Sequence, residues 1–136
     1  MDKVFIDADV ILDFLLDREP FAHDAERLIG LCEKKKIYAC TTAIVFSNAY
    51  YVLRKYAAHK RVTEKLLLLT QWMDIIPSSK SAVVAALQSD FADFEDALQH
   101  FSTIESPATI IITRHIKDYK KSSLSVATPA MFLSGL

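Results

Sequence analysis

Two aspartates near the start of this sequence have the residue type and spacing for metal or acid–base chemistry. Asp7 and Asp9 follow the short apolar run of residues 4–6, and apolar residues resume at helical spacing from Val10. The run is typical of a buried strand, and the residues after it are typical of an amphipathic helix. A carboxylate at the carboxyl end of such a strand lies where open α/β sheets bind ligands. It also needs a partner, because burying an unpaired charge is costly.

Three further acids occur in two later segments. Asp93 and Asp96 open a predicted helix over residues 93–105, and Asp118 follows the β-branched run of residues 109–113. Asp93 is equally well explained as the N-cap of its helix, whereas Asp96 lies too far inside the helix for capping. A parallel sheet would gather the acids of all three segments at one edge. The candidate cation ligands are therefore Asp7, Asp9, Asp93, Asp96 and Asp118.

The chemistry of these acids points to a hard cation. Carboxylates that cluster without zinc-type His or Cys ligands favour Mg²⁺ or Mn²⁺ over zinc. Such ions activate a water molecule and stabilise the charge that develops on a phosphoryl group. The acids alone do not name the substrate, so a phosphatase or a flap-type nuclease would fit them as well.

An asparagine interrupts the apolar stripe of another predicted helix, which begins after the Thr41-Thr42 cap and runs to about residue 59. At 100° per residue, Asn48 falls in the same inward stripe as Val45 and Ala49. An inward amide must be hydrogen-bonded or ligated. Spacing alone favours an amide that ties down a neighbouring loop.

The elements that must position these side chains alternate along the chain. Strands are expected at residues 4–6, 37–40, 74–77, 109–113 and 124–127, with helices between and after them, including one over 62–73. This alternation predicts an α/β fold with a parallel-dominated central sheet and helices on both faces. No internal repeat or linker appears, so we expect one domain over residues 1–136.

Composition excludes several classes of protein. The net charge of the 136 residues is -1, so no global basic field indicates nucleic acid. Gly30 and Gly135 are the only glycines, which excludes glycine-rich phosphate loops. Cys32 and Cys40 match neither a zinc spacing nor a disulfide framework. With no signal peptide and no apolar run of transmembrane length, we expect a cytoplasmic protein without a membrane partner.

Four motifs, taken together, resemble the PIN domain family of metal-dependent ribonucleases, which includes the VapC-type toxins of bacterial toxin–antitoxin pairs. They are Ile-Asp-Ala-Asp-Val-Ile-Leu-Asp at the start, Asp-Phe-Glu-Asp-Ala-Leu-Gln, Ile-Ile-Thr-Arg-His-Ile-Lys-Asp-Tyr, and Val-Ala-Thr-Pro-Ala-Met-Phe-Leu near the end. Their order matches the family over nearly the whole chain. The resemblance implies a three-layer PIN-like fold.

By the same resemblance, Asp7 would be the first metal ligand, Asp96 the second, and Asp118 a supporting acid, with Asp9 in or near the ligand shell. The chain departs from the family pattern at two positions. Asn48 stands where the family commonly has a Glu on the third helix, and His115 stands where Asp or Asn often follows Thr-Arg. Loss of the Glu removes a negative charge and should weaken Mg²⁺ binding, although an amide oxygen can still ligate.

The leading hypothesis is therefore a Mg²⁺- or Mn²⁺-dependent ribonuclease, with metal held by Asp7 and Asp96 and with help from Asn48 and Asp118. The alternative is a PIN fold with a degraded site that serves as an RNA-binding or protein-interaction module. The resemblance also suggests an antitoxin partner and a homodimer, the latter through the leucine-rich helix over 62–73. Candidate contacts to RNA are Thr113, Arg114, Lys117, Ser47, Arg54 and Lys55.

Overall fold

A computed structural model describes residues 1–136 and contains a five-stranded sheet. The strands are β1 (Lys3–Ile6), β2 (Tyr38–Thr42), β3 (Asp74–Ile76), β4 (Ile110–Ile112) and β5 (Ser125–Ala127). The helices are α1 (Ala8–Leu15), α2 (Ala22–Glu33), α3 (Ala43–Leu53), α4 (His59–Leu69), α5 (Lys80–Gln88), α6 (Phe94–Ile104) and α7 (Pro129–Ser134), with a 3₁₀ helix, η1, at Ile116–Tyr119.

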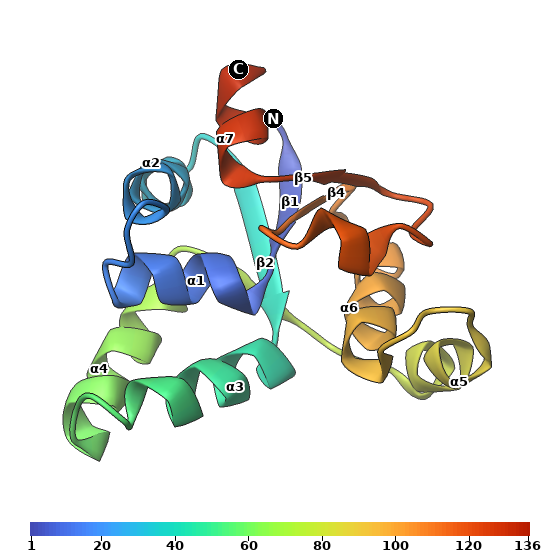
Figure 1. The fold of residues 1–136 in the computed structure, drawn as a ribbon, viewed down its shortest axis with the longest axis horizontal. Coiled ribbons are helices and arrows are strands. Elements are labelled where there is room, and N and C mark those ends of the chain that lie inside the picture. The colour runs from blue at the N-terminus through green and yellow to red at the C-terminus, as the bar shows by residue number, and fades with distance from the viewer.

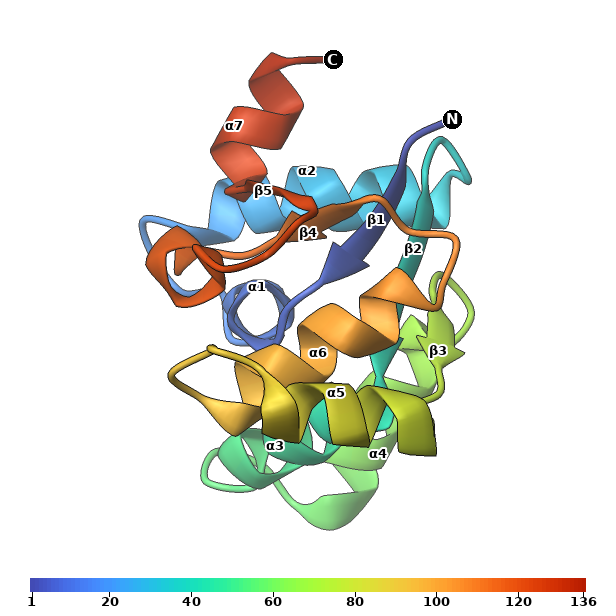
Figure 2. The ribbon, with the colours of Figure 1, turned by 90° about the vertical axis from the view of Figure 1, so that its right-hand side faces the viewer.

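The sheet has the order β3-β2-β1-β4-β5, and all of its neighbouring strands pair in parallel. Helices α1 and α2 lie on one side of β1 and β2, and α5 and α6 lie on the other (Figure 1). The view turned by 90° shows α5 and α6 across the front of the strands (Figure 2). The predicted α/β fold with helices on both faces of a parallel sheet is confirmed.

Burial explains why the apolar runs form the central strands. Val4, Phe5 and Ile6 of β1 have no exposed surface, and neither do Ile111 and Ile112 of β4. They belong to a core of 26 buried residues that also includes the inner faces of α1, α2, α3 and α4. A smaller cluster of four buried residues joins α5 to α6. Strands buried on both faces need continuous rather than alternating hydrophobicity, which is the pattern of these two runs.

The helix after β2 is shorter than its apolar pattern predicts. It ends at Leu53 rather than near residue 59, and α4 begins at His59 rather than at residue 62. The chain reverses there because Val62, at the start of α4, must reach the same buried core as Leu53. The helical spacing also predicts Tyr56 in the inward stripe, and this is wrong, because Tyr56 follows the end of α3 and is 72% exposed.

The placement of Asn48 in that inward stripe is also wrong. Val45 and Ala49 are fully buried, but Asn48 is exposed, on the side of α3 that approaches α6. Because neighbouring positions on a helix are 100° apart, a polar residue beside a buried one can lie at the edge of the apolar face. The amide therefore needs no buried partner.

Outside the sheet, α4 leaves two of its four consecutive leucines at the surface. Leu66 and Leu69 are buried, whereas Leu67 is 67% and Leu68 is 46% exposed.

Both cysteines are free and buried. No helix of the structure has the length and apolar character needed to cross a membrane.

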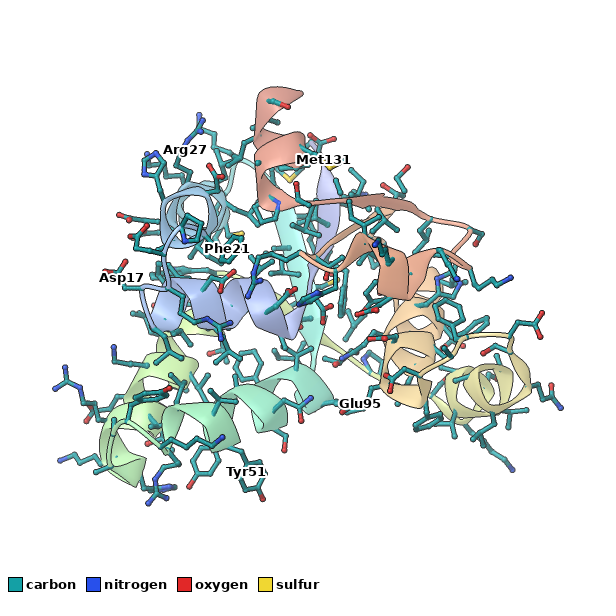
Figure 3. The ribbon with its side chains drawn as sticks, viewed as in Figure 1. Asp17, Phe21, Arg27, Tyr51, Glu95 and Met131 are labelled. Carbon is teal, nitrogen blue, oxygen red and sulfur yellow. The ribbon has the colours of Figure 1, made fainter.

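A buried carboxylate ties α1 to the loop that follows β4. Asp13 is 1% exposed, and its two oxygens accept from the Nε atoms of Arg114 at 2.6 Å and Arg18 at 2.9 Å. The Arg114 guanidinium also lies 3.9 Å from the ring centroid of Phe21, which is labelled in Figure 3. These contacts hold Arg114 against the helical layer and so fix the start of the loop.

Replacing Asp13 with asparagine should lower the free energy of unfolding by about 2–3 kcal/mol, because two guanidinium groups lose a buried anionic acceptor while each keeps contact with water. Urea denaturation followed by circular dichroism would measure the loss. The control is Asp24→Asn, since the ion pair of Asp24 with Arg27 spans 4.0 Å at the surface. That variant should lose less than about 0.5 kcal/mol. Equal losses in the two variants would contradict the role given to Asp13.

Candidate metal centre

The carboxyl ends of β1 and β4 bring two distant segments together. Ile6 pairs with Ile112, the Asp7 N–H donates to the Ile112 carbonyl at 3.0 Å, and Thr113 continues directly from β4. Because the strands are parallel, the residues that follow them emerge at the same edge of the sheet. Asp7 and Thr113 are therefore neighbours, although 106 positions separate them in the chain.

Hydrogen bonds fix the Asp7 carboxylate. One oxygen accepts from the Ala8 N–H at 2.8 Å, so Asp7 is also the N-cap of α1. The other lies 3.0 Å from the Thr113 hydroxyl and accepts from the Tyr119 O–H at 3.2 Å. Burial and the nearby negative charge raise the pKa of Tyr119, so its phenol stays protonated and donates. Asp7 has little freedom to rotate.

Asp9 lies beside Asp7 and binds the same loop. One of its oxygens accepts from the Arg114 N–H at 2.9 Å and lies 3.3 Å from the Thr113 hydroxyl. The imidazole Nε2 of His115 is 3.6 Å from that oxygen. The Thr113 hydroxyl has a single proton, so it can donate to Asp7 or Asp9 but not to both at once.

The two aspartates at the start of α6 have separate roles. Asp93 is the N-cap of α6, where its Oδ2 accepts from the Asp96 N–H at 3.0 Å. Asp96, in the first turn, is half-buried and faces the sheet edge. The sequence allowed Asp93 to be either a helix cap or a cation ligand, and in the structure it is the cap. Asp96 does not cap the helix.

These segments enclose an open pocket of about 210 Å³. Asp118 reaches it from η1, and Asn48 reaches it from α3, where its Nδ2 donates to Glu95 Oε1 at 3.1 Å. Five of the nine residues that line the pocket are acids, and His115 is the one residue of the nine that can carry positive charge. The lining consists of Asp7, Ala8, Asp9, Asn48, Glu95, Asp96, Gln99, His115 and Asp118.

Burial and mutual repulsion raise the pKa of two of these acids. The pKa of Asp7 rises to about 6, chiefly through burial and then through Asp9, against the hydrogen bonds that stabilise its charged form. The pKa of Asp96 rises to about 7 through burial and through the charges of Asp93, Asp7, Asp118 and Glu95. Such shifts mark a site where a proton or another cation is held.

The donor set fits Mg²⁺ or Mn²⁺. Carboxylate and amide oxygens line the pocket, no thiol does, and the excess of negative charge suits a divalent ion. No three His, Cys, Asp or Glu side chains are already grouped closely enough to hold one metal ion. The acids thus surround the pocket without forming a closed ligand group, and the carboxylates of Asp7, Asp9 and Glu95 are held by hydrogen bonds.

The residues expected to contact RNA occupy different places. Thr113 is fully buried, so it orients Asp7 and Asp9 instead of touching a substrate, and the Arg114 side chain is turned to Asp13. Lys117, beside Asp118 in η1, is exposed. Ser47, Arg54 and Lys55 are exposed on and after α3 but do not line the pocket. Of the six candidates, Lys117 is the one exposed basic residue that adjoins a pocket acid, Asp118, in the chain.

Sequence reasoning missed three residues of the site. Tyr119 lies within a quoted motif, but no periodicity signals that its hydroxyl reaches Asp7. Gln99 follows Asp96 by three positions, so a helical projection would have placed the two residues on the same face of the helix. Glu95 precedes Asp96 directly, and adjacent helical positions point about 100° apart, so spacing gave no reason to place both at one pocket.

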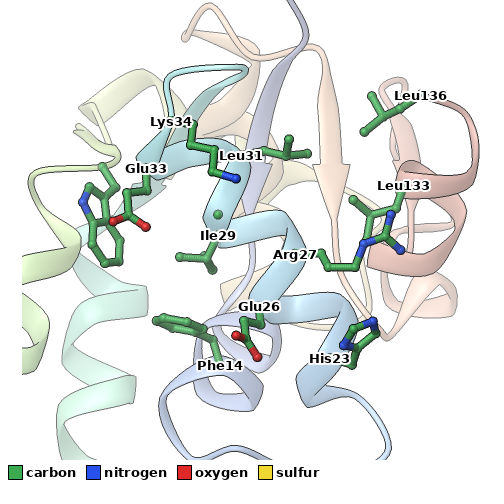
Figure 4. A pocket seen from close by; sticks show the side chains of 12 residues that line it. Phe14, His23, Glu26, Arg27, Ile29, Leu31, Glu33, Lys34, Leu133 and Leu136 are labelled. Atoms are coloured by element: carbon green, nitrogen blue, oxygen red, sulfur yellow. The ribbon is translucent and has the colours of Figure 1, made fainter.

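A larger groove lies elsewhere on the surface. It measures about 560 Å³ and runs beside α2, between Phe14 and the C-terminal residues Leu133 and Leu136 (Figure 4). Its charged residues include Glu26, Arg27, Glu33 and Lys34, so its lining mixes both signs. None of the sheet-edge acids lines this groove.

Comparisons with known proteins agree with this geometry. The chain is 25% identical over 136 residues to Ribonuclease VapC1 of Aquifex aeolicus, covering 96% of this chain and 93% of that protein. Among solved structures it resembles VapBC2 from Rickettsia felis bound to a promoter DNA fragment, with a TM-score of 0.66 at 15% identity over 91% of this chain and 96% of that one.

Two further structures share the fold. FitAB bound to the IR36 DNA fragment gives a TM-score of 0.68 at 14% identity, covering 93% of this chain and 94% of that one. Mycobacterium tuberculosis VapC20, a toxin that cleaves the sarcin-ricin loop, gives 0.63 at 14% identity, with 80% and 87% covered. The family model of the PIN domain matches residues 3–117. The chain therefore belongs to the PIN domain family, as the order of its acidic motifs suggested.

Proposed function

We propose that this protein is a Mg²⁺- or Mn²⁺-dependent ribonuclease and the toxin of a toxin–antitoxin pair. The observation that carries the proposal is that Asp7, Asp96 and Asp118, from three separate segments, line one pocket that is rich in negative charge. Membership of the PIN domain family and similarity to a protein named as a ribonuclease support the reaction class. The similarity to VapBC2 and FitAB supports an antitoxin partner.

In this proposal Asp7 and Asp96 hold the cation, and Asp118 and Asp9 support it. Asp93 serves as the cap of α6. The bound ion would supply activation of a water molecule and neutralisation of charge on the phosphodiester. Thr113 and Tyr119 keep the Asp7 carboxylate oriented, and the raised pKa of Asp96 lets it exchange its proton for the ion near neutral pH.

RNA would approach the pocket along exposed basic side chains. Lys117 stands next to Asp118. Arg54 directly follows α3, about 9 Å along the helix axis from Asn48 at ~1.5 Å per residue, and Lys55 comes next in the chain. Ser47 and Tyr51 are exposed on the same helix, and Tyr51 projects outward from it (Figure 3). An exposed ring beside basic groups suits single-stranded RNA, because bases stack on it without sequence preference.

We also propose that the protein is a homodimer in the cytoplasm. Leu67 and Leu68 of α4 are exposed apolar residues next to one another, which supports the expectation that a second copy of the chain covers this helix. An antitoxin bound to the protein would restrain the enzyme.

A second candidate is a PIN fold that binds RNA or protein without cleaving. Asn48 in place of an acid and the absence of three already grouped metal-ligating side chains favour it. Cleavage assays separate the two candidates, because a binding module would retain RNA affinity and leave the RNA intact with any divalent ion.

Asp7→Asn and Asp96→Asn should each reduce Mn²⁺-dependent cleavage of a mixed structured RNA by at least about 100-fold, because each removes a charged ligand from the pocket. Gel assays with Mn²⁺, Mg²⁺ or a chelator would measure the loss. Asp24→Asn, at the surface of α2, is the control for charge and should cut as the wild type does. Cleavage that survives both substitutions would place the active site elsewhere, and no cleavage by the folded wild type would favour the binding module.

Mn²⁺ affinity should rise with pH between about 5 and 8, because at the lower pH protons occupy Asp7 (pKa about 6) and Asp96 (pKa about 7) and the ion must displace them. Calorimetric titration in two buffers of different ionisation enthalpy would report both the affinity and the protons released. In Asp96→Asn the dependence should shrink, leaving the lower-pH part that belongs to Asp7. A pH-independent affinity in the wild type would contradict this account.

Arg54→Ala and Lys55→Ala should weaken RNA binding without changing kcat, because both side chains lie outside the pocket. Each should reduce the slope of log affinity against log salt by about 0.7 if it contacts one phosphate of a single strand. Fluorescence anisotropy of a labelled RNA in chelator would measure this. Lys36→Ala is the control, since Lys36 precedes β2 at the opposite end of the sheet. Equal effects at all three positions would indicate non-specific attraction.

A further inference from the structure

The hydrogen bond between Asn48 and Glu95 connects two helices across the acidic pocket. Asn48 is the sixth residue of α3, and Glu95 is in the first turn of α6. The Asn48 amide donates to Glu95 Oε1 at 3.1 Å, and both residues line the pocket with Asp7, Asp96 and Asp118. Figure 3 shows Glu95 at the N-terminal end of α6, where this helix approaches α3.

Glu95 has no cationic partner to hold it there. None of the four ion pairs of the structure includes it, and its one side-chain hydrogen bond is the one from Asn48. An acid in the first helical turn is stabilised by the helix dipole wherever its side chain points. The dipole therefore explains why an acid is tolerated at this position but not why its carboxylate is turned to an amide on α3.

Glu95 differs from the neighbouring acids Asp93 and Asp9 in the groups that its carboxylate binds. Asp93 Oδ2 is occupied by the capping bond to the Asp96 N–H, and Asp93 does not line the pocket. Asp9 is bound by the loop after β4. Glu95 uses one carboxylate oxygen for Asn48 and keeps the other unbonded within the protein.

We propose that Glu95 is a further ligand of the pocket's cation and that Asn48 is the residue that positions it. The inference rests on the proposed metal-dependent function. It means that the negative charge missing from the third helix is supplied from α6, and that an amide at position 48 is required because a carboxylate there would repel Glu95. Asn48 then acts through Glu95 and not as a ligand in its own right.

Mn²⁺ titration by calorimetry tests this directly, with circular dichroism to verify the fold of each variant. Glu95→Gln should weaken Mn²⁺ binding by about 10- to 100-fold, the range typical of groups that support a metal site. Asn48→Ala should weaken it less, because Glu95 remains but is no longer held. Glu64→Gln, an exposed position on α4, removes the same charge away from the pocket and should bind as the wild type does.

The decisive variant exchanges the two groups. Asn48→Glu combined with Glu95→Gln restores one carboxylate and one amide to the same pair, with the donor now on α6. It should recover most of the affinity that Glu95→Gln loses. Wild-type affinity in Glu95→Gln would overturn the proposal, and so would a double variant that binds no more tightly than Glu95→Gln.

The Mn²⁺ titration tests the role of Glu95 separately from the ribonuclease proposal, which the RNA cleavage assay tests. If Mn²⁺ binding follows the expected order but the wild type cleaves no RNA, Glu95 is a ligand and the ribonuclease proposal fails. If the wild type cleaves RNA with Mn²⁺ and Glu95→Gln retains the wild-type affinity, the ribonuclease stands and the role of Glu95 fails. A wild type that binds no Mn²⁺ would overturn both.

Discussion

The repulsion among carboxylates at one edge of the sheet is the constraint on which the rest of the structure depends. Five acids line a pocket of about 210 Å³, and two of them have pKa values raised to about 6 and about 7. Without a counter-ion such a group destabilises the folded state, because each charge is partly removed from water and faces its neighbours. The fold tolerates it because the Asp7 carboxylate accepts hydrogen bonds from Ala8, Thr113 and Tyr119 and directly follows the buried strand β1, which pairs with β4. A divalent cation would relieve the repulsion without any change of fold.

The same constraint explains how the basic residues are used. Arg114 follows the strand that ends at the pocket, and its side chain could have neutralised the acids there. It is bound instead to the buried Asp13 and stacked on Phe21. An arginine in the pocket would compete with a metal ion for the same oxygens, because both satisfy a carboxylate. By holding Arg114 on α1, the structure anchors the loop that carries Thr113 and Asp118 and leaves the pocket open to an added cation.

The parts of the fold that sequence predicts are those fixed by local periodicity. The runs that became β1 and β4 are buried on both faces, so their continuous hydrophobicity identified them, and Thr42 and Thr128 cap helices as side-chain chemistry leads one to expect. The end of α3 was not predictable in this way, since Leu53 stops the helix only because α4 must fold back to bury Val62. Asn48 was placed inside the core for the same reason: the apolar stripe defines a face, but only the packing of α6 decides where its edge lies. Tyr119 and Glu95 were missed because their contacts join segments distant in the sequence.

The relation between Asn48 and Glu95 shows why the acids of such a site are better counted in space than along a motif. A carboxylate and an amide in contact contribute one negative charge to the pocket, whichever helix carries the carboxylate. Two carboxylates in contact would add a second negative charge. Before any cation binds, their repulsion would destabilise the first turn of α6. An asparagine on α3 is therefore not by itself a sign of a lost site. What matters for a divalent ion is the total charge of the pocket and the number of oxygens that can reach the ion. The number of oxygens within reach depends on how closely α3 and α6 approach the edge of the sheet.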